Sequence, residues 1–579
     1  MSDGVRRGVR ELAAAHREGR REIAETVEEL IAALAGADPA VFIAPESAER
    51  LRWRAQELSC GPRDLPLLGV PFAVKDNIDV AGLATTAACP GYGSTPPGSA
   101  RVVRRLEAAG AIVAGKTNLD QFATGLVGTR TPHGALSSTF SAEHISGGSS
   151  SGSAIAVAAG LVPFSLGTDT AGSGRVPAAF NDLVGMKPTR GLLSTAGVIP
   201  ACRTLDCVSI FAHDVEDAEA VLSVAKGFDA ADAYSRRVPT RDAPGRPATL
   251  GLPLPGQLEF FGDERSERAW ERARATIAGL ADRVVEVDLV PFLETARLLY
   301  EGPWVAERYA AFGAVLERDD VRADPIVREI VLGGRDLRAV DAFRAEYRLA
   351  DLRREAEGAF AAIDALMLPT APTFPTHDEV AAEPIAANAR LGVWTNFVNL
   401  LDLAALAVPG GLREDGLPFG VTFIAPAWSD KALLRLGSAW RSAQNRQPPG
   451  EGIDIAVVGA HLTGMPRNHE LVALGARYRT TALTAPSYRL FDLDDGTGRP
   501  GLIRDDGSGA SFEVEVWQMA PRAFGRLVAD ISSPLSIGTL ELTDGRRVKG
   551  FLCEEHATRH ATEVTGHDGW RAYRAAGPA

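Results

Sequence analysis

Short apolar runs alternate with longer stretches in which apolar residues recur every three or four positions. The short runs have the length of buried strands, and the longer stretches have the period of a helix that packs on one face. Strands are predicted at 67–74, 111–114, 162–166, 248–252, 284–289, 365–368 and 421–425, and helices at 100–109, 153–159, 266–281, 304–318, 337–360 and 430–444. Such alternation predicts an α/β fold with a mostly parallel sheet.

The two ends of the chain differ in pattern from this middle part. Residues 1–35 alternate charged and apolar residues at helical spacing, which predicts a helical N-terminal arm on a first domain that extends to residue 447. The Pro and Gly residues of 445–452 predict a linker. Residues 453–556 contain short strand-like runs separated by Asp-Gly turns and predict a small α+β domain, and the polar segment 557–579 predicts a loosely ordered tail.

Composition narrows the class of protein. The 579 residues are 45% hydrophobic and 23% charged, which is typical of a globular protein. A formal net charge of −13 disfavours nucleic acid and anionic membrane surfaces as the main partners. The most apolar run, 154–166, is too short to span a membrane, and residues 1–34 lack the apolar core of a signal peptide. The five cysteines have neither metal-ligand spacing nor a disulfide pattern, so we expect a cytoplasmic protein without a metal site.

Two serines in glycine-rich runs carry the strongest chemical signal. Ser149 lies in Ser-Gly-Gly-Ser-Ser-Ser-Gly at 146–152, and Ser173 lies in Gly-Thr-Asp-Thr-Ala-Gly-Ser-Gly at 167–174. Lys75, in Pro-Phe-Ala-Val-Lys-Asp-Asn, completes a candidate Ser-Ser-Lys relay, which can cleave an amide without histidine, metal or cofactor. Taken singly, each motif is more typical of a loop or of a surface charge, so the hypothesis rests on their combination.

Together with their flanking residues, these motifs resemble the amidase signature family of serine hydrolases. The similarity includes Val74–Asn77, Gly115–Asn118 and Gly147–Arg190, and it covers about residues 25–445. It implies the amidase signature fold, in which a mixed and largely parallel central sheet is flanked by helices. It also implies a reaction that needs no cofactor.

The resemblance assigns roles to the motif residues. Ser173 is implied as the nucleophile, Lys75 as the base, and Ser149 as the bridge that passes a proton between them. Lys75 can accept a proton only when its amine is neutral, so it must be desolvated or lie near other cations. Four backbone N–H groups are candidates for the oxyanion hole, those of Thr170, Ala171, Gly172 and Ser173.

Two charged residues beside these motifs are expected to be structural. Asp169 is predicted to be a hydrogen-bond acceptor that holds the glycine-rich loop, rather than a reactant. Lys116 is predicted to pair with a carboxylate near Asp120.

Further similarity narrows the substrate. Residues 191–212 are similar to allophanate hydrolases, which are amidase signature enzymes of urea breakdown. Residues 457–468, 485–490 and 514–517 are similar to the C-terminal domain of those enzymes, which general amidases lack. The resemblance implies hydrolysis of allophanate (urea-1-carboxylate) to ammonia and carbon dioxide, in urea degradation, with a functional link to a urea carboxylase. It also implies a C-terminal fold similar to that of γ-glutamyl cyclotransferases.

Allophanate is a small anion, and a pocket for it needs a cation that matches a carboxylate. Arg308 is the best candidate because a guanidinium can form two parallel hydrogen bonds with a carboxylate, and the resemblance places Tyr300 beside it. Pro303 is expected at the first position of a helix, with Tyr300 just before that helix. Gly128 and Thr129 are expected to add loop contacts. The alternative is that Tyr300 and Arg308 only cover apolar surface.

The resemblance also implies a second reaction, in which His461 of the C-terminal domain decarboxylates N-carboxycarbamate, the first product. His461 forms an anion site with Arg477, Tyr478 and Tyr488 in one interpretation, and all four have packing roles in the other. Cyclotransferases use an acidic residue late in their domain, and residues 528–531 offer no glutamate, so cyclotransferase activity is not expected.

Two alternative functions stay open at this point. The chain could be the amidase component of a tRNA-dependent amidotransferase, which the acidic charge balance and the C-terminal domain disfavour. It could also be a general amidase whose C-terminal domain is an inert dimerisation module. In the leading interpretation we expect a homodimer that acts on a small anionic substrate.

Overall fold

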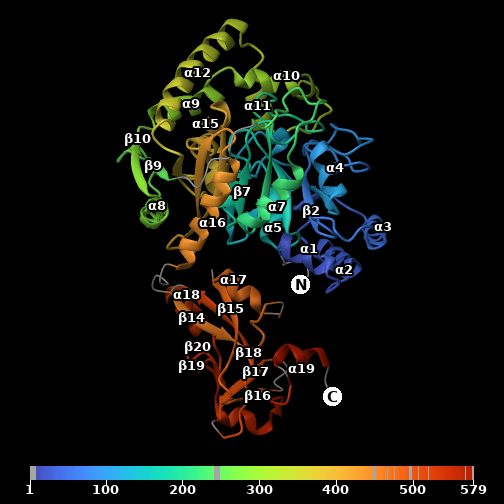
Figure 1. Cartoon of the computed structure of the whole chain (residues 1–579), viewed down its shortest axis with the longest axis vertical. Helices are drawn as coiled ribbons and strands as arrows, with labels where there is room; N and C mark the ends of the chain where they lie inside the picture. The colour runs from blue at the N-terminus through green and yellow to red at the C-terminus, as the bar shows by residue number, and fades with distance from the viewer. Residues whose placement is uncertain are drawn as a thin grey trace. The chain divides into compact units, whose positions relative to one another are not determined.

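The computed structural model describes residues 8–239, 248–446, 452–463, 465, 467–474, 476–493, 499–505, 507–519, 521–567 and 569–576. The chain divides into two compact units, residues 1–446 and 447–579 (Figure 1). Among the described residues, no helix combines the length and the apolar character needed to cross a membrane.

In its described part, the first unit is built on an eleven-stranded sheet with the strand order β1-β3-β2-β6-β8-β7-β12-β13-β11-β9-β10. Its strands are β1 (Phe42–Pro45), β2 (Pro71–Lys75), β3 (Ile112–Thr117), β6 (Phe164–Asp169), β7 (Val184–Lys187), β8 (Cys207–Ala212), β9 (Thr249–Pro253), β10 (Arg283–Val287), β11 (Ala365–Pro369), β12 (Leu403–Leu412) and β13 (Pro418–Pro426). A separate hairpin joins β4 (Ser137–Ser138) to β5 (Ser141–Ile145).

The α/β class and the mixed sheet are confirmed, but parallel pairing is less extensive than predicted. Of the ten neighbouring pairs between described strands, four are parallel: β2 with β3 and β6, and β9 with β10 and β11. The other six are antiparallel. The difference arises because apolar runs do not encode strand direction. In addition, β7, β8 and β12, which form only antiparallel pairs, lie outside the predicted strands.

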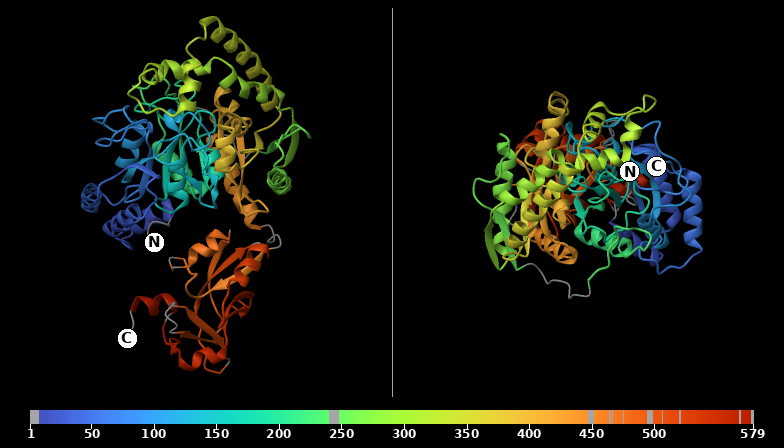
Figure 2. Two further views of the ribbon diagram at one scale, coloured as in Figure 1. Left: turned by 180° about the vertical axis from the view of Figure 1, so that it is seen from behind. Right: turned by 90° about the horizontal axis from the view of Figure 1, so that it is seen from above.

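Helices cover the sheet of the first unit. α5 packs against β2, β3, β6 and β8, and α16 packs against β12 and β13. α9, α10, α11 and α12 lie together at one end of this unit (Figure 2). The helices are α1 (Val9–Arg17), α2 (Ile23–Ala35), α3 (Ala48–Ser59), α4 (Arg101–Ala108), η1 (Gln121–Ala123), α5 (Ser151–Ala158), α6 (Val176–Ala179), α7 (Val215–Ala225), α8 (Glu264–Ala275), η2 (Thr276–Gly279), α9 (Val290–Glu301), α10 (Trp304–Leu316), α11 (Pro325–Leu332), α12 (Ala339–Phe360), α13 (His377–Ala382), α14 (Pro384–Gly392), α15 (Phe397–Leu400) and α16 (Asp430–Arg446).

The central strands β2 and β6 bring the candidate residues together. Every residue of both strands is buried, including the polar residues with which they end. Phe72 of β2 stacks on Phe164 of β6, with ring centroids 5.0 Å apart. Lys75 and Asp169 are the last residues of these two strands. Because the strands are parallel, both end at the same edge of the sheet, where α/β proteins commonly place their sites.

The N-terminal arm consists of α1 and α2 and is fastened to the body of the first unit. The buried His16 of α1 forms hydrogen bonds of 2.8 Å with the Leu68 carbonyl and with the Thr26 hydroxyl of α2. The Val9 amide donates to the Asp217 carboxylate of α7 at 2.7 Å. The arm is therefore an integral part of this unit.

The second unit combines two sheets with short helices. A five-stranded sheet has the order β15-β18-β14-β20-β19, and a three-stranded sheet has the order β17-β16-β21. The elements are β14 (Ile453–Val457), α17 (Asn468–Ala473), β15 (Arg477–Leu483), β16 (Tyr488–Asp492), β17 (Pro500–Arg504), β18 (Glu513–Met519), α18 (Pro521–Ala529), β19 (Leu535–Glu541), β20 (Arg547–Cys553), η3 (Glu555–His560), β21 (Thr562–Glu563) and α19 (Trp570–Ala576).

The prediction of a loosely ordered tail after residue 556 is wrong for the described residues up to 576. Strand β21 pairs with β16, and Trp570 of α19 is only 1% exposed. Arg571 forms ion pairs with Glu513 and Glu515 of β18, at 2.6 and 2.5 Å. The segment is mostly polar in sequence, so the few apolar residues that anchor it, such as the buried Trp570, form no recognisable pattern.

Candidate active site

Lys75 and Ser149 meet in a buried polar centre. The Lys75 amine donates to the Ser149 hydroxyl and to the Thr168 hydroxyl, in both cases at 2.8 Å. Lys75 and Ser149 are fully buried, and Thr168 is 2% exposed. Asn77 donates to the same Thr168 hydroxyl at 3.2 Å. The predicted Lys75–Ser149 contact is confirmed, and Thr168 is an additional partner of the amine.

Burial sets the protonation state of Lys75. It lowers the pKa of the amine from its ordinary value to about 7, because an ammonium loses its hydration there. The carboxylates of Asp120, Asp206 and Asp169 oppose this shift, and the nearby cation of Arg308 reinforces it. At neutral pH a large fraction of the amine is therefore neutral, which is the form that can accept a proton.

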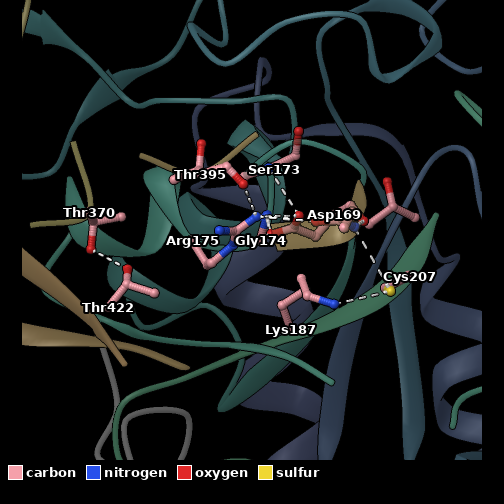
Figure 3. A network of polar contacts seen from close by, with 12 residues as sticks. Asp169, Ser173, Gly174, Arg175, Lys187, Cys207, Thr370, Thr395 and Thr422 are labelled. Carbon is pink, nitrogen blue, oxygen red and sulfur yellow. Dashed lines mark hydrogen bonds and ion pairs between the residues drawn. The ribbon is translucent and has the colours of Figure 1, made fainter. Parts of the chain in front are cut away.

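The loop that follows β6 carries Ser173 and is held by a buried ion pair. The Asp169 carboxylate pairs with the Arg175 guanidinium through two hydrogen bonds of 2.9 Å, and it accepts from the amides of Gly172 and Gly174 at 2.9 and 3.0 Å (Figure 3). Asp169 and Arg175 are both fully buried. Asp169 is thus the loop-holding acceptor that the sequence predicts.

The Ser173 hydroxyl forms no hydrogen bond with Ser149 in the described part of the chain. Within the described chain, its hydrogen-bond contact is a long one to the Gly125 carbonyl, at 3.5 Å. The hydrogen bond that would link Ser173 to Ser149 stays a prediction. Ser149 follows Gly148, whose environment is so tight that a side chain there would lie 2.2 Å from the Asp120 carboxylate.

The predicted oxyanion hole needs one correction. The Gly172 amide already donates to Asp169 at 2.9 Å, so it is not free to bind an oxyanion. The amides of Thr170, Ala171 and Ser173 have no partner among the described residues. Gly172 instead supplies backbone freedom, with a φ of +133° and no room for a side chain beside Thr395.

Arg308 lies on α10 with its guanidinium buried, at 1% exposure. Nη1 donates to the Thr124 hydroxyl at 2.9 Å, while Nε and Nη2 are buried and have no partner among the described residues. The guanidinium lies over the ring of Tyr300, 5.5 Å from its centroid. Arg308 therefore offers two free donors of the kind that a carboxylate accepts.

Tyr300 lies in the last turn of α9 and lines a cleft of about 430 Å³ together with Trp394 and Asn396. The expectation that it precedes a helix is met, since α10 starts at Trp304, but Pro303 is the N-cap rather than the first residue of α10. Because Tyr300 faces both the cleft and Arg308, the cleft is the candidate route from solvent to the guanidinium.

Of the other predicted residues of the first unit, Gly128 and Lys116 have structural partners. The Gly128 amide donates to Asp120 at 3.0 Å, so it is not free for a substrate, and Thr129 is half-buried, with no side-chain hydrogen bond among the described residues. Lys116 pairs with a carboxylate, as predicted. That carboxylate is Asp76, at 2.9 Å.

In the second unit, His461 is paired with an acidic residue that the sequence did not single out. Its Nε2 lies 3.0 Å from the Glu470 carboxylate, and its ring stacks on Phe551 with centroids 5.1 Å apart. Tyr488 is fully buried, and its hydroxyl accepts from the Glu541 amide at 2.9 Å, which is a packing role.

The other two members of the predicted anion site give it no support. Tyr478 is 50% exposed and contacts Thr481 through its hydroxyl. The side chain of Arg477 lies outside the described residues.

Each of the two units matches a known protein family. Residues 25–434 match the amidase family, and residues 453–575 match the allophanate hydrolase C-terminal domain. The chain belongs to the amidase family. It is therefore a hydrolase that acts on amides, and this amidase carries the second domain as well. Among the described residues, no cluster of side chains could hold a metal ion.

Several relatives cover most of this amidase. Urea amidolyase from Saccharomyces cerevisiae is 44% identical over 544 residues, which is 88% of this chain but 30% of that protein. The chain thus spans less than a third of that relative. The structure of Kluyveromyces lactis allophanate hydrolase matches with a TM-score of 0.73 and 40% identity, over 98% of this chain and 99% of that one. A component of the glutamyl-tRNA(Gln) amidotransferase from Symbiobacterium thermophilum is 36% identical over 73% of this chain and 94% of that protein.

The protonation of Lys75 gives a prediction for this amidase. kcat/KM should rise as the pH passes about 7, because Lys75 then loses its proton and becomes able to accept one. Lys75→Arg should be as inactive as Lys75→Ala, since arginine keeps the charge but does not deprotonate. Rates of ammonia release from pH 5.5 to 9 test both points. The exposed Lys431 is the matched control, and Lys431→Arg should behave as the wild type. An active Lys75→Arg variant would exclude the base role.

Proposed function

We propose that this amidase hydrolyses allophanate, with Ser173 as the nucleophile, Ser149 as the bridge and Lys75 as the base. The observation that carries the substrate choice is Arg308, a buried guanidinium with two nitrogen atoms that lack partners among the described residues, which lies close enough to Lys75 to lower the pKa of the amine. A buried cation with free donors is suited to a carboxylate. Allophanate presents a carboxylate one atom away from its terminal amide carbon.

The first half of the proposed reaction acylates Ser173. The Ser173 oxygen attacks the terminal carbonyl carbon of allophanate while its proton passes to Ser149, and the Ser149 proton passes to Lys75. The amides of Thr170, Ala171 and Ser173 stabilise the oxyanion. The C–N bond then breaks, and the leaving nitrogen takes the proton back through Ser149 to depart as ammonia.

The second half releases the product. Water attacks the acyl carbon, gives its proton to the same relay, and frees Ser173, so that N-carboxycarbamate leaves. In the second unit, we propose that His461 protonates the nitrogen of N-carboxycarbamate as a C–N bond breaks and carbon dioxide leaves. Glu470 supports this role, because a carboxylate 3.0 Å away orients the imidazole.

The wider setting of this reaction is also a proposal. Allophanate is the product expected of a reaction that carboxylates urea, so we propose that a urea carboxylase supplies the substrate and that both act in the cytoplasm. The tRNA-dependent amidotransferase is the weaker alternative. This alternative rests on the 36% identity to the amidotransferase component. It gives no role to the second unit of this chain. A general amidase with an inert second unit would leave the buried, unpartnered guanidinium nitrogens of Arg308 without a role.

Arg308 should decide which amides are cleaved. Arg308→Met should lose allophanate turnover, because the substrate carboxylate loses a charge-assisted contact worth roughly 2–5 kcal/mol. It should keep activity on biuret, which is neutral. The readout is kcat/KM for both compounds, with Arg297→Met as the control, since Arg297 lines the same cleft but is exposed. Parallel losses on both compounds would refute the proposed carboxylate contact.

The second unit should govern the fate of the intermediate. His461→Ala should release the first ammonia at the wild-type rate but accumulate a carboxylated intermediate at early times. Parallel measurement of ammonia and carbon dioxide within seconds of mixing tests this, because spontaneous decarboxylation hides the difference later. The exposed His556 provides the control variant, His556→Ala. Identical time courses for all three proteins would leave His461 with a packing role.

The expected homodimer is proposed on a separate observation. Val340, Phe343 and Tyr347 lie on one face of α12 and are 43, 61 and 67% exposed, an unusual apolar stripe for a free surface. We propose that a second copy covers it. Phe343→Ser combined with Tyr347→Ser should convert a dimer into a monomer in light scattering. Trp53→Ser, at a similarly exposed aromatic residue, should not. An unchanged mass for both variants would exclude this surface.

A further inference from the structure

The turn at 201–206, just before β8, is a compact piece closed by its own hydrogen bonds. The Cys202 carbonyl accepts from the amides of Leu205 and Asp206, both at 2.9 Å. The Asp206 carboxylate accepts in return from the amides of Ala201 and Cys202, at 2.8 and 3.1 Å. Asp206 is 5% exposed. These four hydrogen bonds within one turn restrict its conformation.

One side of this turn is bonded to the loop that carries Ser173. The Thr170 hydroxyl donates to the Asp206 carboxylate at 2.5 Å. The Asn399 side chain donates to the carbonyls of Asp169 and Leu205, at 2.8 and 3.0 Å. The nucleophile loop and the turn are therefore joined at two separate points, and both points are buried.

The other side of the turn is bonded to the helix that carries Arg308. The amide and the hydroxyl of Thr204 donate to the two oxygens of the Glu307 carboxylate, both at 2.8 Å. The Cys202 thiol donates weakly to the Trp304 carbonyl at 3.8 Å. Glu307 immediately precedes Arg308 on α10. The turn is thus a physical bridge between the nucleophile loop and the first turns of α10.

We propose that Asp206 is a positioning residue that fixes the distance between the nucleophile loop and Arg308, and so selects substrates by the separation of their amide carbon and carboxylate. The inference rests on the proposed function in one respect, the binding of a substrate carboxylate by Arg308. Burial raises the pKa of Asp206 to about 6, against the effect of the Thr170 hydroxyl and of the Arg308 cation. The carboxyl is accordingly ionised at neutral pH and able to accept all three of its hydrogen bonds.

A fixed distance matters because the amide carbon and the carboxylate of the substrate must be held in place at the same time. A displacement of about 1 Å at the attacked carbon can slow an enzyme about 100-fold. In allophanate one nitrogen separates the amide carbon from the carboxyl carbon. A substrate with one more atom between these groups cannot satisfy Arg308 and the oxyanion amides together while the bridge is rigid. Loosening the bridge should relax this discrimination.

The experiment compares two stable carboxylated amides, malonamate, which has the spacing of allophanate, and succinamate, which is one methylene longer. The quantity measured is the ratio of their kcat/KM values, with propionamide as the neutral reference. The wild type should prefer malonamate. Asp206→Asn and Thr170→Val should each reduce the ratio by about tenfold, mainly through KM for malonamate. Thr170→Ser keeps the hydroxyl and should restore the ratio.

One control variant and three adverse outcomes complete the test. Thr295→Val removes a buried hydroxyl of α9 that donates to the Pro291 carbonyl of the same helix, and it should leave the ratio unchanged. Activity on all three amides that falls in parallel, with the ratio preserved, would overturn the positioning role in favour of a general loss of structure. A wild type without length preference would overturn it too. A wild type that prefers malonamate but ignores allophanate would refute the proposed substrate alone.

Discussion

Lys75 is the last residue of β2, a fully buried strand, so its amine is removed from water. The rest of the site depends on this burial. An isolated ammonium is unfavourable there, which is why its pKa falls to about 7. Three carboxylates lie near enough to restore the proton, but each has other partners. Asp169 is neutralised by Arg175, and Asp120 accepts from two backbone amides. These partners limit how far the carboxylates raise the pKa of Lys75, and that pKa stays near neutral pH.

The loop that carries Ser173 also depends on buried charge. The Asp169–Arg175 pair lies inside the fold, and it ties the loop amides of Gly172 and Gly174 to a fixed point. A buried pair of this kind is costly to form, and the loss of either partner would leave an uncompensated buried charge, so the loop conformation depends on both residues. The amides of Thr170, Ala171 and Ser173, which have no partner in the described part of the chain, stay the predicted donors to an oxyanion.

The residues that lie in recognisable short motifs were the easiest to predict. Lys75, Ser149 and Ser173 each lie in a separate motif of the sequence, and the resemblance to the amidase signature family supplied their expected roles. Thr168 lies in the same motif as Ser173 and could have been included. Asp206 and Glu470 could not, since each gains its meaning from a partner brought near by the fold: Thr170 for Asp206, and His461 for Glu470. The ordered end of the chain was missed because Trp570 is an isolated apolar residue in a polar segment.

The lowered pKa of Lys75 also has a consequence for covalent chemistry. An amine that is neutral at pH 7 is a nucleophile, whereas an exposed lysine is almost entirely protonated at that pH. Isocyanic acid, which forms slowly in urea solutions, carbamylates neutral amines. In this site, the full burial of Lys75 and the two hydroxyls that hold its nitrogen stand between the amine and such a reagent. The packing that makes the amine reactive thus also protects it from the chemistry of urea solutions.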